Sequence, residues 1–72
     1  MNGMQLMRLR DCARATLLGQ VMQWPGSEMR GLEAMGFLTA VPLGDSRYGH
    51  QATAQGLAYL KQPDVLKQLE VL

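Results

Sequence analysis

The sequence is poor in the residues from which catalytic and metal centres are built. It contains one cysteine, Cys12, and one histidine, His50, among 72 residues. A lone cysteine excludes a disulfide within the chain and is typical of a reducing cytoplasm, and one cysteine with one histidine cannot make a zinc site within one chain. A Cys12–His50 dyad would lack a neighbour to orient it, so Cys12 is better interpreted as a small buried hydrophobe. We therefore expect no enzyme, no metal and no cofactor.

Aromatic residues, charge and long apolar runs are scarce as well. The chain has one Trp, two Tyr and one Phe, so its core must be built from Leu, Val, Ala and six Met. The formal net charge of +1 is far from the strongly basic balance of many nucleic-acid-binding domains, so any such function must rest on locally placed residues. Residues 1–9 form no signal peptide and no membrane span. We expect a cytoplasmic protein without membrane contact.

The residues that are present indicate one folded domain over residues 1–72. Hydrophobic residues make up 47% of the chain and charged residues 18%, which is too apolar for a disordered segment. Asp11 and Thr16 are possible N-caps within a stripe of apolar positions at helical spacing. We expect either one long helix or, preferably, two helices with a break near residues 11–16. The stripe consists of Leu6, Leu9, Ala13, Leu17, Val21 and Trp24.

The best-defined helix is predicted over residues 28–35. Pro25 and Gly26 end the preceding segment, and Ser27 is a natural N-cap for the next one. Gly36 is suited to the C-terminal stop of this helix. Its core-facing side is formed by Met29, Leu32 and Met35.

Two short stretches with strand character follow, at residues 37–42 and 48–52. The loop between them, residues 43–47, contains Gly, Asp and Ser, which mark the turn of a hairpin. A two-stranded hairpin is marginally stable alone in water. We therefore expect it to lie against the helices.

Two helical segments are predicted at the end of the chain. Thr53 caps the first, which runs to about Gln62 and is interrupted by Pro63. The second, residues 64–72, has an apolar face with little chain left to cover it, so we expect a homodimer interface there. The alternative is that the segment folds back in cis against Leu6, Leu9 and Ala13. Its apolar face consists of Val65, Leu66, Leu69 and Leu72.

The order of helices, hairpin and further helix resembles the winged helix-turn-helix superfamily, a small α+β fold. Residues 32–38, LEAMGFL, look like the end of a recognition helix that runs into a first wing strand. Residues 48–60, YGHQATAQGLAYL, are similar to the second wing strand and the Thr-x-x-Gly helix start of MarR-like and PadR-like regulators. The resemblance covers roughly residues 27–62. Earlier residues match only in being helical.

The resemblance implies that this chain is a bacterial or phage protein and that it binds DNA. In this family, the exposed face of the third helix enters the major groove, and the wing contacts the backbone or the minor groove. The alternative is an ordinary solvated surface, because Glu28 and Glu33 on the helix would repel phosphates. Carried onto this chain, the DNA-binding residues are Ser27 and Arg30 on the helix and Arg47, Tyr48 and His50 on the wing.

Two functions follow from these observations. The leading hypothesis is a small transcriptional regulator that binds double-stranded DNA as a homodimer, because one copy makes few phosphate contacts and two copies match a palindromic site. The alternative is a phage or mobile-element module that binds a host or CRISPR protein, which the near-zero net charge favours. A basic cluster of Arg8, Arg10 and Arg14 fits both, since it could rest on a phosphate backbone or stay solvated.

Overall fold

The first helix, α1, spans Gly3–Leu17 in the computed structural model, which describes residues 1–71. It begins at a capping box, in which the Gln5 amide donates to the Asn2 side chain (2.8 Å) and the Asn2 amide donates to the Gln5 side chain (3.0 Å). It ends at Leu17, and the chain turns away after the C-cap Leu18 at Gly19, whose φ of 74° lies in the left-handed region that favours glycine. The buried face of α1 consists of Leu6, Leu9, Cys12 and Ala13.

α1 continues without interruption through residues 11–16, so the predicted break is wrong. Thr16 does not cap a second helix. Its hydroxyl donates to the Cys12 carbonyl (2.8 Å) and accepts a hydrogen bond from the Ala52 amide (2.8 Å), which ties α1 to the hairpin. Asp11 forms ion pairs with two arginines of α1 instead of capping a helix. Both polar side chains therefore have partners, and neither of them interrupts the helix.

A segment without helical structure, residues 20–26, connects α1 to the next helix. Val21 and Trp24 lie in this segment, so their placement on the helical stripe is wrong, because the helix has already ended at Leu17. The segment is attached to the hairpin through Met22, whose amide donates to the His50 carbonyl (2.9 Å) and whose carbonyl accepts from the His50 amide (2.8 Å).

The second helix, α2, spans Ser27–Ala34 and lies one residue earlier than predicted at each end. Its N-cap is Gly26, with extended backbone and no side-chain cap, so Ser27 is the first helical residue and not the cap. Gly36 ends the helix as predicted, with a φ of 83°. Met29 and Leu32 are buried, whereas Met35, at the C-cap, is 39% exposed.

Strands β1 (Leu38–Gly44) and β2 (Arg47–Ala52) form the predicted antiparallel hairpin. The strands are longer and the turn is shorter than predicted, since the turn consists of Asp45 and Ser46. Both have positive φ (50° and 63°), as in the type I′ turn that matches the twist of two paired strands. A register irregularity follows Pro42, which has no amide hydrogen to donate to the ladder.

Helix α3 spans Ala54–Tyr59 and begins at the predicted cap, where the Thr53 hydroxyl accepts from the Gly56 amide (3.0 Å). Gly56 packs so closely on the main chain of Phe37 that a Cβ atom there would overlap its carbonyl oxygen. The Thr-x-x-Gly pattern therefore combines a cap with a close backbone contact. α3 ends before Gln62, where the sequence predicted its end.

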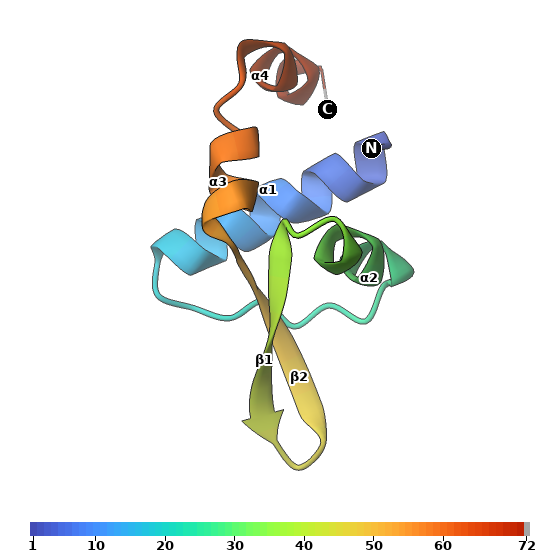
Figure 1. Ribbon diagram of the computed structural model, residues 1–72, viewed down its shortest axis with the longest axis vertical. Helices are drawn as coiled ribbons and strands as arrows, with labels where there is room; N and C mark the ends of the chain where they lie inside the picture. Colours follow the sequence, from blue (N-terminus) through green and yellow to red (C-terminus); the bar gives the residue numbers. More distant parts are fainter. Residues whose placement is uncertain (72) are drawn as a thin grey trace.

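Helix α4 spans Pro63–Glu70, with its proline in the first turn, where no amide hydrogen is needed. It lies at the opposite end of the molecule from the hairpin tip (Figure 1). The predicted α+β class, mostly helical with a two-stranded hairpin, is confirmed. No helix within residues 1–71 has the length and apolar character needed to cross a membrane. The main core consists of Leu9, Cys12, Ala13, Met29, Leu32, Leu38 and Ala52.

Candidate functional site

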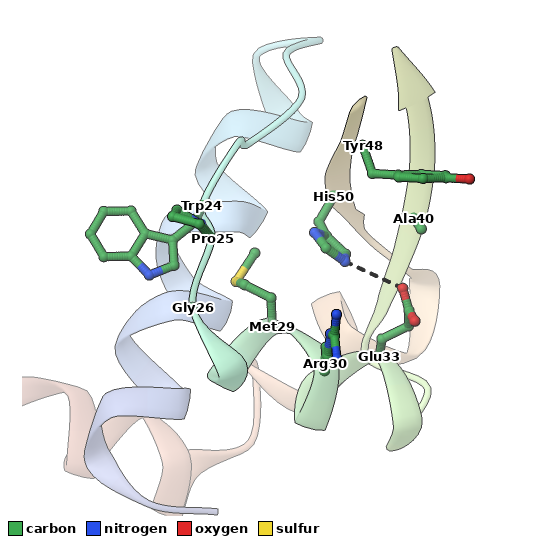
Figure 2. A pocket seen from close by; sticks show the side chains of 9 residues that line it. All are labelled: Trp24, Pro25, Gly26, Met29, Arg30, Glu33, Ala40, Tyr48 and His50. Carbon is green, nitrogen blue, oxygen red and sulfur yellow. Dashed lines mark hydrogen bonds and ion pairs between the residues drawn. The ribbon is translucent and has the colours of Figure 1, made fainter. Parts of the chain in front are cut away.

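A cavity of about 520 Å³ lies between α2 and the hairpin (Figure 2). Residues 24–26 close one side of it. Met29, which contributes to its lining, is only 1% exposed, so the cavity reaches down to the core. The other lining side chains are Arg30 and Glu33 of α2 and Ala40, Tyr48 and His50 of the hairpin.

A second cavity, of about 370 Å³, adjoins the first toward the hairpin turn. The two share Trp24, Pro25 and Tyr48, and the second adds Gln23 and Arg47. We call the two cavities together the α2–hairpin groove. The groove therefore runs from the exposed face of α2 to the start of β2.

The backbone of His50 is fixed from two elements. It pairs in both directions with Met22, and its carbonyl also accepts a hydrogen bond from the Cys12 thiol of α1 (3.3 Å). The side chain of His50 is only 14% exposed. Its ring is therefore held in a defined position on the hairpin side of the groove.

Across the groove, the His50 ring contacts the carboxylate of Glu33 on α2. Nε2 of the ring lies 3.3 Å from Oε1 of the carboxylate, a contact drawn as the dashed line in Figure 2. Because an ionised carboxylate can only accept, the ring nitrogen is the donor. The Glu33 side chain is 45% exposed, and no other hydrogen bond reaches this carboxylate from residues 1–71. Its second oxygen is therefore free to accept from a ligand.

Arg30 lies one helical turn before Glu33, so the two side chains share a face of α2. Figure 2 shows both on the side of α2 that faces the hairpin. Arg30 is exposed, and within residues 1–71 it has no acidic partner at ion-pair distance. Arg47, at the start of β2, is likewise exposed and unpaired in the described chain. The groove thus presents two arginines that are available to a ligand.

Four of the five residues predicted to bind DNA line this groove. Arg30, Tyr48 and His50 line the larger cavity, and Arg47 lines the smaller one. Ser27 is exposed at the first position of α2 and lines neither. The sequence prediction therefore identified a group of residues that the fold brings together from two elements.

Sequence reasoning missed the role of Trp24, which it assigned to the core. Trp24 is 41% exposed and lines both cavities. The guanidinium carbon of Arg8 lies 3.8 Å from the centroid of its ring. The signal in the sequence was the Pro25-Gly26 pair, because an aromatic residue directly before such a turn has left the helix.

The basic cluster of α1 does not extend the groove. Arg8 and Arg10 both pair with Asp11, at 3.7 Å and 3.4 Å. Arg14 is exposed and has no ion-pair partner within residues 1–71. None of the three arginines lines either cavity, and Arg8 contacts the groove wall only from behind, through Trp24.

The conceivable Cys12–His50 dyad has no contact between thiol and ring. The Cys12 thiol bonds to the backbone carbonyl of His50. Desolvation by burial raises the pKa of this thiol to about 11. Within residues 1–71, no group of three or more His, Cys, Asp or Glu side chains lies close enough to hold a metal ion.

The residues of the apolar face predicted for a dimer differ in how far they are exposed in the structure. Val65 is 2% exposed, so the single chain already covers it. Leu66 is 48% exposed, and Leu69 is half-buried. Leu72 lies outside the described residues. Among the three described residues of this set, Leu66 is therefore the one most available to a second copy.

Comparisons of this chain with known protein families, with curated proteins and with solved structures found no match. The resemblance to winged-helix proteins therefore stays a prediction.

Proposed function

We propose that this chain is a small regulator that binds double-stranded DNA with α2 and the hairpin. The observation that carries the proposal is that Arg30 and Arg47 lie on one hollowed face, although they come from two elements. Neither arginine has an acidic partner in residues 1–71. Arginines without such partners are suited to phosphate oxygens and to the base edges of the major groove.

The shape of the molecule supports two contacts with one duplex. The molecule is 39 Å long, and the hairpin extends along this axis away from the helices (Figure 1). In this arrangement α2 approaches the bases in the major groove, while Arg47 reaches the adjacent phosphate backbone. Tyr48, which is 64% exposed, adds a second donor near the hairpin tip.

The small number of basic residues in the groove limits what one copy can do. Arg30 and Arg47 together neutralise few phosphates, and phosphate neutralisation supplies most of non-specific affinity. A homodimer doubles these contacts and matches a palindromic site. We therefore propose that the functional species is a dimer.

A salt titration of DNA binding tests the proposal. Fluorescence anisotropy of a labelled random duplex is measured with the whole protein at several salt concentrations. We expect log affinity to fall linearly with log salt concentration, with a slope of about −0.9 per phosphate neutralised. If the chain binds no duplex even at low salt, the proposal is wrong.

A protein-interaction module, such as a phage or mobile-element factor that binds a host protein, is the second candidate. The observation that favours it is the exposure of Trp24 (41%) and Tyr48 (64%), which line the same cavity as Arg30. Trp, Tyr and Arg are the residues most enriched at the centres of protein interfaces. This candidate predicts no affinity for DNA at low salt, so the same titration separates the two functions.

A further inference from the structure

Glu33 is an unexpected residue in a groove that binds DNA. It is the carboxylate that lines the larger cavity, beside Arg30, and a carboxylate near phosphates is repelled. Glu33 also lies in the last turn of α2, where the helix dipole disfavours negative charge. Neither the helix dipole nor phosphate binding favours a carboxylate here, and the contact with His50 uses only one of its two oxygens.

Base readout gives the second oxygen a partner. In the major groove, guanine presents two acceptors that match the donor fork of arginine, and cytosine presents an amino group that a carboxylate accepts. We propose that Arg30 reads a guanine and Glu33 reads a cytosine, so that the chain prefers DNA sites containing these two bases in adjacent base pairs. This inference rests on the proposed DNA-binding function and adds its sequence preference.

The spacing of the two residues fits neighbouring base pairs. Arg30 and Glu33 are three residues apart, which corresponds to about 4.5 Å along the axis of an α-helix. Successive base pairs are about 3.4 Å apart. When α2 lies along the major groove, the two side chains therefore face adjacent pairs.

His50 makes Glu33 a fixed acceptor. Its ring nitrogen holds Oε1 of Glu33 at 3.3 Å, and the side chain of His50 is only 14% exposed. Two backbone hydrogen bonds to Met22 hold the histidine itself. The other carboxylate oxygen is thus oriented before DNA arrives, which reduces the entropy lost on binding. His50 acts here as a positioning residue.

Glu28 provides a matched control for Glu33. It also carries a carboxylate on α2, but it lies in the first turn, where the helix dipole favours it. It lines neither cavity of the groove. Glu28→Gln and Glu33→Gln therefore remove the same charge from the same helix, and only the second removes the proposed base contact.

The experiment is selection of binding sites from a pool of randomised duplexes. We expect the unmutated protein to enrich sites with guanine and cytosine in neighbouring pairs. Glu33→Gln should change the preferred base at one position from cytosine to adenine, because glutamine reads adenine, with a change in preference of roughly tenfold. Arg30→Ala should remove the preference for guanine at the neighbouring position, and Glu28→Gln should leave both preferences unchanged.

A variant of His50 tests the positioning role in the same pool. His50→Leu should reduce the preference for cytosine while leaving the preference for guanine intact. An equal loss of both preferences would overturn the positioning role.

Two other outcomes separate a failure of the proposed base preference from a failure of the proposed DNA-binding function. If Glu33→Gln and Glu28→Gln raise the affinity for every duplex equally and leave base preference unchanged, Glu33 does not read a base, although the DNA-binding function stands. If the unmutated protein enriches no duplex at low salt, both the preference and the DNA-binding function are wrong.

Discussion

The guanidinium of Arg8 stacks on the indole ring of Trp24, with 3.8 Å between its central carbon and the ring centroid. This contact joins α1 to the segment that precedes α2. Arg8 is also held by Asp11, at 3.7 Å, and its buried Nε has no hydrogen-bond partner among residues 1–71. Because Trp24 lines both cavities, the stacking fixes one wall of the α2–hairpin groove.

The first prediction is that Arg8 and Trp24 are energetically coupled. A cation over the face of a partly exposed Trp contributes about 0.5–1 kcal/mol. A double-mutant cycle with Arg8→Ala and Trp24→Ala, measured by urea unfolding, should give a coupling energy of this size. The control cycle pairs Trp24→Ala with Arg14→Ala and should give none. Strictly additive effects in the first cycle would show that the stacking does not stabilise the fold.

The second prediction concerns phosphate contact by Arg47. Arg47→Ala should weaken binding to all DNA sequences and lower the magnitude of the salt slope by about one unit. Lys67→Ala is the matched control, since it removes one exposed positive charge from α4, at the other end of the molecule from the hairpin tip (Figure 1). If the two variants bind DNA with the same slope, Arg47 makes no phosphate contact.

The third prediction contrasts two glycines. A Cβ atom at Gly56 would overlap the main chain of Phe37, which cannot move without shifting β1. Gly56→Ala should therefore destabilise the fold by about 1–3 kcal/mol. A Cβ atom at Gly31 meets only the flexible end of the Gln5 side chain, at 2.9 Å, and alanine is the better helix former by up to about 1 kcal/mol. Gly31→Ala should leave stability unchanged or raise it, and equal losses in urea unfolding would contradict this difference.

The parts of the fold that the sequence predicted depend on local signals. The cap at Thr53 is decided by residues within one helical turn, and the stop at Gly36 by one residue in the left-handed region. The break near residues 11–16 was wrong because the partner of Thr16 is Ala52, which lies 36 residues away. No local pattern contains that partner.

In the candidate site, too, the features that depend on local sequence could be predicted and those that depend on distant partners could not. Arg30 could be predicted because its exposure follows from helical periodicity within α2. The hydrogen bond between Glu33 and His50 could not, since it joins residues 17 positions apart across two elements. The environment of Trp24 depends in the same way on Arg8, in another element.

The fourth prediction is that Cys12 is unreactive in the folded chain. Burial leaves its side chain inaccessible and raises its pKa to about 11 from a usual value of 9.0. The aromatic disulfide dithiobis(nitrobenzoate), at pH 8, should label native protein far more slowly than protein unfolded in urea. Labelling at the same rate in both states would contradict the burial of this thiol.

The same pKa shift predicts how stability depends on pH. The folded state keeps the Cys12 proton that the unfolded state loses, so this contribution to stability is fully present below pH 9 and is lost as pH rises toward 11. Cys12→Ala should flatten the fall in urea midpoint over this range.

The last prediction concerns assembly through α4. The single chain covers Val65, at 2% exposure, and leaves Leu66 at 48% and Val71 at 84%, so a second copy would contact the outer side of α4. We expect sedimentation equilibrium at micromolar concentration to give the mass of two chains. Leu66→Asp should then give folded monomers, because a carboxylate would lose its hydration in the interface without gaining a partner. Val65→Asp is the contrasting variant, and it should unfold the chain at any concentration, because it puts the charge inside the monomer. A mass of one chain for the unmutated protein would refute the dimer and leave α4 as a helix that only completes its own domain.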